Sequence, residues 1–223
     1  MRKAVIGAAV ALVVLALLGF GADRAVAYVA GRAITDRIER SFTGASSVST
    51  TIVGVPILTQ VARGSLDHVT VALDGVATGK GVTIDSVVAD LYDVSTSSPR
   101  TAKRVVATAD ITTAELQKAL GDTWTLRPDG DAFAVQWTGA IPVTARVVPV
   151  VRDGSVALEL DSVTVFGLSV DGASVPSAVR DRINALAGSL GALPLGLTPQ
   201  SVTVTPTGVT LVATGTDVDL ESA

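Results

Sequence analysis

Polar and apolar residues alternate along most of the chain after residue 47, with the period of two that is typical of β-strands. Within Leu66–Val71, for example, even-numbered and odd-numbered side chains would face opposite sides of a sheet. The predicted strands are Val48–Val55, Ser65–Ala77, Val82–Val94, Ala102–Ile111, Ala132–Thr138, Ile141–Val151, Ser155–Val165, Ser201–Thr205 and Val209–Ala213. Asp-Gly steps favour tight turns, and hairpins are predicted at Asp74-Gly75, Asp129-Gly130, Asp153-Gly154 and Asp171-Gly172.

Three other stretches have the spacing of helices. An apolar residue every fourth position predicts an amphipathic helix over Ala25–Phe42, whose stripe needs an apolar partner. Thr112–Glu115 is a capping box that predicts a short helix to Leu120, with Gly121 as its stop. A third helix is predicted over Pro176–Leu190, with Val179, Ile183, Leu186 and Leu190 on one face. Long strands with a few separate helices predict an α+β fold, and no change in composition marks a second folded domain.

The segment Val53–Gly64 joins two of these strands through a short apolar helix. Pro56 favours an extended residue before it, so the first strand can end there. Ile57 and Val61 are four residues apart, as are Leu58 and Ala62, and each pair would share a helical face. Gly64 supplies the left-handed stop. No reactive group stands out in this segment, which favours a binding surface over a reaction centre.

The N-terminus has the pattern of an export segment. Met1-Arg2-Lys3 precedes Ala4–Ala22, an uncharged apolar run close to the roughly 20 residues that span a bilayer. Ala25-Val26-Ala27 offers a small-x-small cleavage pattern, so a retained anchor and a cleaved signal both remain open. The two basic residues favour a cytoplasmic N-terminus and export of the rest. We expect residues 1–22 to be a signal or anchor and residues 23–223 to be one extracytoplasmic domain, with a buried core helix as the alternative for the apolar run.

Charge and composition exclude one class of partner. The formal net charge is −4; without residues 1–22, which hold two of the 17 basic residues, 15 basic residues face 21 acidic ones, a balance of −6. Nucleic-acid binding needs a Lys/Arg footprint and stacking aromatic rings, whereas this chain is 4% aromatic and its basic residues are scattered. Any contact with a membrane must therefore come from residues 1–22 or from local apolar surface.

Few residues could carry catalysis. His68 is the single histidine, and the aspartate before it would point to the opposite face of a strand, so we expect a structural role for His68. Asp90 and Asp93 are interpreted as a strand end, and Asp217, Asp219 and Glu221 as a solvated face of a last strand or a frayed end. Acid–base chemistry at either group and cation binding at the tail acids are the weaker alternatives. The chain has no cysteine, which excludes thiolate chemistry. We expect no enzyme activity, no cofactor and no metal site.

The sequence GVPILTQV at Gly54–Val61, with Gly64, Val69 and Val71 after it, resembles the signature of the LmeA-like phospholipid-binding proteins. These are exported proteins of actinobacterial cell envelopes. The end of the chain is similar too, in Leu193–Pro199 followed by Val202–Val204 and Gly208-Val209. Ile57 departs from the pattern, because an aromatic residue is usual there. The resemblance extends from the N-terminal apolar segment almost to the C-terminus.

The resemblance implies a long curved antiparallel sheet wrapped around amphipathic helices, similar to tubular lipid-binding modules of the TULIP type. It also implies that the partner is a phospholipid or glycolipid, bound at the outer face of the cytoplasmic membrane. One branch of the family is linked to elongation of mannose-bearing envelope lipids. The residues that we expect to contact lipid are Val26, Ala30, Ile34, Ile38, Phe42, Val55, Ile57, Leu58, Val61, Ile183 and Leu186. The alternative is a membrane-tethered scaffold that binds an envelope enzyme through the same apolar surfaces.

Overall fold

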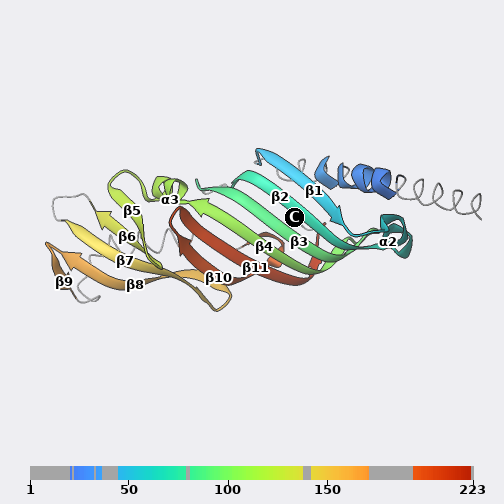
Figure 1. Cartoon of the computed structure of the whole chain (residues 1–223). Helices are drawn as coiled ribbons and strands as arrows, with labels where there is room; N and C mark the ends of the chain where they lie inside the picture. Colours follow the sequence, from blue (N-terminus) through green and yellow to red (C-terminus); the bar gives the residue numbers. More distant parts are fainter. Residues whose placement is uncertain are drawn as a thin grey trace, which may run out of the picture.

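The computed structural model describes residues 21, 23–32, 34–36, 45–78, 81–137, 142–170 and 193–221, which form two open antiparallel sheets. The sheets lie end to end in an elongated molecule (Figure 1). The six-stranded sheet has the order β1 (Ser47–Val53), β2 (Ser65–Ala77), β3 (Thr83–Ser95), β4 (Thr101–Thr112), β11 (Gly208–Asp219), β10 (Thr198–Thr205). The five-stranded sheet has the order β5 (Trp124–Asp129), β6 (Ala132–Trp137), β7 (Val143–Arg152), β8 (Ser155–Val165), β9 (Leu168–Val170). The predicted antiparallel pairing of long strands with few helices is confirmed, but the single long sheet that was predicted is divided into two.

All nine predicted strands are present, and β2 and β8 have the predicted bounds. Strands β5 and β9 were not predicted. Strand β5 carries Arg127 and Pro128 in its second half, which weakens its pattern, and it is ordered by pairing with β6. Strand β9 has three residues, too few for a periodic pattern. Strand β11 continues to Asp219 because β4 offers it pairing partners as far as Thr101.

The hairpin predictions have mixed outcomes. Turns at Asp129-Gly130 and Asp153-Gly154 join β5 to β6 and β7 to β8, and both Asp153 (φ 52°) and Gly154 (φ 69°) are left-handed. The hairpin predicted at Asp74-Gly75 is wrong, because both residues lie inside β2. Gly75 has φ 62°, and a Cβ there would lie 2.6 Å from Ser46 Oγ. Glycine is needed at this position for its backbone angle and for the close approach of Ser46. Asp171-Gly172 lies outside the described residues.

The helices are short. Helix α2 spans Ile57–Arg63, helix α3 spans Thr113–Leu120, and a 3₁₀ turn, η2, spans Pro194–Gly196. Residues 23–32 and 34–36 are also helical; we call them the N-terminal helix, and they confirm the first half of the predicted Ala25–Phe42 helix. The rest of that prediction, and the predicted helix Pro176–Leu190, lie outside the described residues. Among the residues described, none of the helices is both long and apolar enough to cross a membrane.

The capping box of α3 is half formed. The Thr112 side chain accepts a hydrogen bond from Glu115 N at 3.4 Å, as predicted. The Glu115 side chain does not return to Thr112 N. It accepts from Thr83 N at 3.2 Å instead, and Thr112 N donates to Asp85 Oδ2 at 2.7 Å. Strand β3 therefore supplies the second cap, which ties the start of α3 to the beginning of β3 in the six-stranded sheet.

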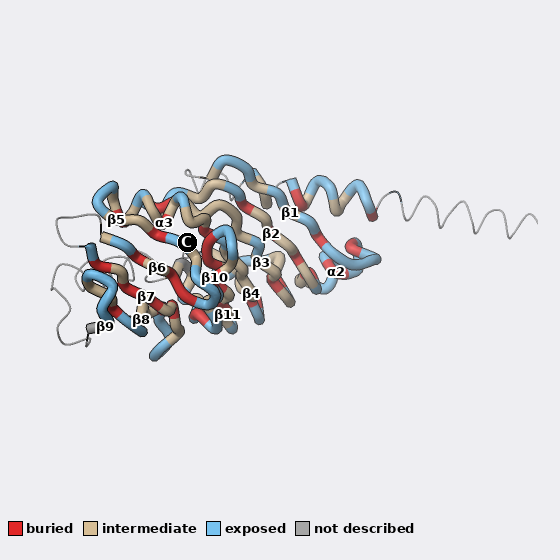
Figure 2. The backbone as a smooth tube through the Cα atoms, turned by 60° about the vertical axis from the view of Figure 1, so that its left-hand side comes forward, coloured by how far each residue is buried: buried red, intermediate tan, exposed pale blue. Residues whose placement is uncertain are grey.

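Two apolar cores follow the length of the molecule. The first includes Leu116 and Leu120 of α3, Phe133 of β6 and Val143 of β7, and it also takes in Ile111, Val204 and Val209 from the six-stranded sheet. It therefore joins the two sheets. The second core is built on the other end of the six-stranded sheet, from Ile52, Ile57, Leu66, Val69, Val71, Leu73, Leu91, Val94, Ala102, Val105 and Val218. Figure 2 shows the result as buried and exposed residues alternating along the strands.

Candidate functional site

The face of the six-stranded sheet that carries the second core, which we call the inner face, has unusually small side chains in its middle. Residues directly opposite each other in adjacent strands lie on the same face. Ala89 of β3 is opposite Ala107 of β4, and Ala107 is opposite Ala213 of β11. In the next row, Ala109 lies between Val87 and Leu211. Ala89 packs against the second core, which places both rows on the inner face.

The four alanines Ala89, Ala107, Ala109 and Ala213, which we call the alanine strip, lie between the two cores. Ala213 is 3% exposed, but Ala89, Ala107 and Ala109 are only partly buried although they belong to central strands. An alanine side chain is a single methyl group, so the apolar layer above the backbone is thinner here than at the Val and Leu residues on both sides. The strip is an apolar surface that a long, narrow hydrocarbon could cover.

One end of the inner face is covered by the N-terminal helix. Its Val26, Ala27, Ala30 and Ile34 pack against the second core, which confirms that the predicted stripe has an apolar partner. Gly31 lies on the same helix, and a Cβ there would be 3.2 Å from the Thr50 carbonyl oxygen of β1. The helix therefore approaches the edge strand closely, backbone to backbone.

Helix α2 packs on the sheet through Ile57 and Gln60. Ile57 is fully buried and Gln60 is 3% exposed, whereas Leu58 (43%) and Val61 (40%) face solvent. Ile57 and Val61 are four residues apart on the helix, as predicted, but only Ile57 is buried, because the helix turns Ile57 and Gln60 toward the sheet. Gln60 Oε1 accepts from Asp67 N at 2.9 Å, so the buried amide joins the helix to the start of β2.

The start of α2 is held from outside the segment. The Asp23 carboxylate, 3% exposed, accepts a hydrogen bond from Leu58 N at 2.8 Å. This side chain from the N-terminal helix satisfies one of the free N–H groups in the first turn of α2, the role that a capping residue usually plays from within its own helix. The N-terminal helix and α2 are thereby fixed to each other.

Gly54, before α2, is expected to tolerate alanine poorly. Its φ is 108°, and an added Cβ would lie 2.8 Å from Gln60 Nε2. We expect Gly54→Ala to lower the free energy of unfolding by about 1–3 kcal/mol, because strain and a displaced buried amide add together. Gly64→Ala is the matched control, since Gly64 has φ 82° but nothing within 4 Å of the added atom. Equal urea midpoints for the two variants would contradict this expectation.

The opposite, outer face of the sheet carries the polar side chains singled out in the sequence. His68 Nε2 lies 2.8 Å from Asp90 Oδ1, and the same oxygen accepts from Thr70 Oγ1 at 2.7 Å. The His68 ring stacks on Tyr92 with centroids 4.7 Å apart, and the Arg104 guanidinium lies 4.2 Å from the centroid of the Tyr92 ring. Asp90 is 22 residues from His68, so no local sequence pattern indicated this pair. Thr70 Oγ1 donates to Asp90 Oδ1 and also lies 3.4 Å from His68 Nε2, so the three side chains form one polar cluster on the outer face.

The His68–Asp90 pair is expected to make stability depend on acid pH. Hydrogen bonds from His68 and then Thr70 hold the pKa of Asp90 below its usual value of about 3.9. A carboxylate with a depressed pKa stabilises the fold above the unfolded value, and that contribution is lost as the pH falls through the folded value. We expect Asp90→Asn to be less stable than the wild type at pH 6, and the gap to shrink below about pH 4. Urea unfolding at several pH values measures the gap; a constant gap would contradict the assignment.

The expected lipid-contact residues fall into three groups by their place in the structure. Val26, Ala30 and Ile34 lie against the second core, and Ile57 is inside it. Val55 (57% exposed), Leu58 and Val61 face solvent, so they do not line the covered part of the inner face. The remaining four, Ile38, Phe42, Ile183 and Leu186, lie outside the described residues. The alanine strip was not predicted, because alternating Val and Ala residues do not reveal which strands will bring their alanines together.

Comparison with known proteins bears on what this surface does. The model of the LmeA-like phospholipid-binding family matches residues 21–214, which include the helices described above and both sheets except the last five residues of β11. No curated protein and no solved structure matches the chain. Because the match covers most of the chain, this protein belongs to the LmeA-like phospholipid-binding family.

Proposed function

We propose that this protein binds phospholipid outside the cytoplasmic membrane, with the acyl chains lying along the inner face of the six-stranded sheet. The observation that carries the proposal is the alanine strip, which is partly exposed between two buried cores. Membership of a phospholipid-binding family supports the class of ligand. The N-terminal helix, whose apolar stripe already packs on this face, would form one wall beside the acyl chain.

The energetics favour exchange rather than irreversible capture. Each CH₂ group removed from water gains about 0.8 kcal/mol, so a 16-carbon chain gains on the order of 12 kcal/mol. Relative to a bilayer that gain nearly vanishes, because the lipid is already in hydrocarbon. The protein would therefore exchange lipid with membranes without chemistry, and we propose that it acts as a binding or transfer protein and not as an enzyme.

The place of action follows from the N-terminal sequence. Ala4–Ala22 would hold the protein at the membrane or direct its export, with Arg2 and Lys3 on the cytoplasmic side. A tether of this kind keeps the binding face at high local concentration beside the lipid. We propose that the protein supports the assembly of envelope lipids or lipoglycans. We also propose that its domain is a module of the tubular lipid-binding kind.

Crosslinking with a photoreactive phospholipid tests the proposal. The full chain is placed in vesicles that contain phospholipid with a photoreactive group on the acyl chain, and crosslinked peptides are mapped by mass spectrometry. We expect crosslinks in β3, β4 and β11, in the peptides that carry the alanine strip. Crosslinks in residues 1–22 alone would overturn the proposal. Copurification of a protein partner at equal stoichiometry, without lipid on the sheet, would favour the scaffold alternative.

A further inference from the structure

The end of the six-stranded sheet at α2 exposes four apolar side chains that are close in the sequence. Val53 (41% exposed) ends β1, Val55 (57%) lies in the turn after it, and Leu58 (43%) and Val61 (40%) are on α2. We call these four residues the apolar tip. Large aliphatic side chains gathered at one end of an exported domain commonly mark a contact with another apolar phase.

The apolar tip is held rigidly by the residues beneath it. Ile57 is fully buried in the second core, and Gln60 joins α2 to β2 through Asp67 N. At the far end of the helix, Gly64 N donates to Val61 O at 3.0 Å. Leu58 and Val61 are therefore presented on a helix that is anchored to the sheet.

The chain leaves the described fold beside this tip. Asp23 is fixed to Leu58 N at 2.8 Å, so the residue that follows Ala4–Ala22 is in direct contact with α2. The apolar run of Ala4–Ala22 has about the length of a membrane span. A bilayer that holds this run would begin one residue away from the apolar tip. Figure 1 shows α2 and the start of the N-terminal helix at the same end of the molecule, opposite β9.

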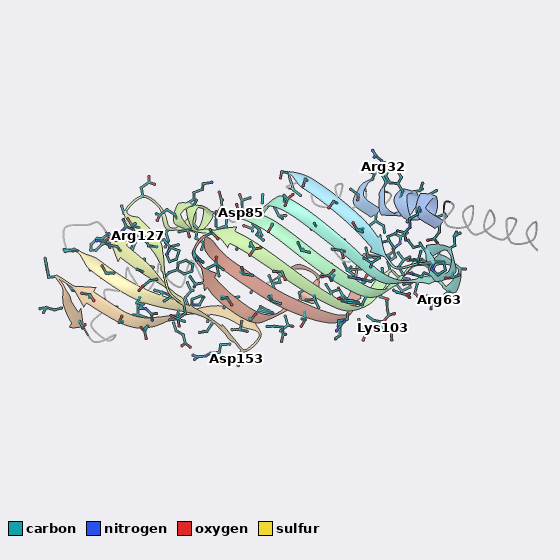
Figure 3. All side chains as sticks on the ribbon, in the orientation of Figure 1. Arg32, Arg63, Asp85, Lys103, Arg127 and Asp153 are labelled. Atoms are coloured by element: carbon teal, nitrogen blue, oxygen red, sulfur yellow. The ribbon has the colours of Figure 1, made fainter. Side chains whose placement is uncertain are left out.

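The charges near the tip favour contact with hydrocarbon over attraction to anionic headgroups. Arg63, at the end of α2, is paired with Asp67 at 3.0 Å. Figure 3 places Arg63 and Lys103 at this end and Arg32 on the N-terminal helix. Arg63 is the one charged residue of α2. The domain after residue 22 has more acidic than basic residues. Contact through the tip should therefore depend little on salt or on the fraction of anionic lipid.

We propose that the apolar tip docks on the surface of the bilayer that holds residues 4–22, so that Val55, Leu58 and Val61 enter the interfacial region. The proposal rests on membrane attachment by that segment, which is part of the proposed function, but not on acyl-chain binding by the alanine strip. It fixes which end of the elongated molecule faces the membrane. The five-stranded sheet then points away from the bilayer.

The chain has no cysteine, so single labels can be placed without altering it otherwise. Full-length Val55→Cys and Leu58→Cys proteins carry an environment-sensitive fluorophore and are placed in phosphatidylcholine vesicles with or without acyl-brominated lipid. Leu168→Cys, 72% exposed on β9, is the control at the opposite end. We expect blue-shifted emission and quenching by brominated lipid at both tip positions, neither at Leu168, and little change on adding salt. In the Val55→Cys protein, Leu58→Lys with Val61→Lys should remove the shift and the quenching, whereas Leu168→Lys should not.

Other outcomes overturn the proposal. Tip labels that stay in water while the protein is bound to vesicles exclude docking. Protected labels without quenching, together with disulfide-linked dimers of the unlabelled Leu58→Cys protein under oxidising conditions, would show that a second copy covers the tip. Failure of the chain to enter the vesicles would refute membrane attachment and docking together. The crosslinking yield on β3, β4 and β11 is measured in the same samples, so loss of acyl-chain binding is recognised separately.

Discussion

Replacing Ala107 by phenylalanine is expected to abolish phospholipid binding without unfolding the protein. Ala107 is at the centre of the alanine strip, opposite Ala89 on one side and Ala213 on the other, and it is only partly buried. A benzyl group would occupy the space above these methyl groups, where the acyl chain is proposed to lie. We expect at least about a tenfold loss of crosslinking, equivalent to about 1.4 kcal/mol of binding free energy. The melting temperature reports whether the fold survives.

Thr108→Phe is the matched control for this variant. Thr108 is the next residue of β4, and its side chain points to the outer face, opposite Val88 and Val212. Thr108→Phe adds the same ring to the same strand but on the outer face, so this variant should leave phospholipid binding unchanged. A folded Ala107→Phe protein that binds lipid like the wild type would exclude the alanine strip as the binding surface. Equal losses in both variants would indicate an effect on the sheet rather than on the strip.

Replacing Ile57 by alanine is expected to give the largest loss of stability among substitutions in α2. Ile57 is fully buried in the second core, and truncation of such a side chain costs about 2–5 kcal/mol through lost burial and the cavity left behind. The same change would loosen α2 and, through the bond between Leu58 N and Asp23, the start of the N-terminal helix. Urea unfolding of the wild type and the Ile57→Ala protein measures the difference in the free energy of unfolding.

Leu58→Ala is the control that separates the effect of losing a buried aliphatic side chain from the effect of losing an exposed one. Leu58 is the next residue of α2 and is 43% exposed, so its truncation should cost less than about 1 kcal/mol. If Leu58→Ala were as destabilising as Ile57→Ala, the assignment of Ile57 as the anchor of α2 would be wrong. The comparison also checks that the apolar tip can be mutated without damage to the core beneath it.

The proposed binding face and the proposed docking tip lie on the same sheet, and we expect them to serve different steps of lipid transfer. The apolar tip is at the end where β1 meets α2, and the alanine strip crosses β3, β4 and β11 farther along. The N-terminal helix packs against the core between them. A lipid that leaves the bilayer beside the tip would therefore meet the apolar inner face first. Variants of the tip should slow this transfer, whereas variants of the strip should remove binding itself.

The sequence by itself determined the local structure. Alternation of polar and apolar residues located every long strand, because a side chain in a strand faces one side of the sheet at every second position. The capping residue Thr112 located α3, and four-residue spacing indicated a helix that contains Val26, Ala30 and Ile34. These signals act over a few residues, so they survive without knowledge of the fold. The scarcity of reactive residues also favoured binding over catalysis.

Only the tertiary structure decided which apolar residues are buried and which are presented to a partner. Ile57 and Leu58 are adjacent and equally apolar, yet one is in the core and the other at the tip, because the orientation of α2 is set by Gln60 and by Asp23, 35 residues before Leu58. The alanine strip exists because β4 pairs with β3, its neighbour in the sequence, on one side and with the distant β11 on the other, in a register that aligns their alanines. Long-range pairing of this kind leaves no local pattern, and for that reason the sequence could indicate a binding protein but not the surface that binds.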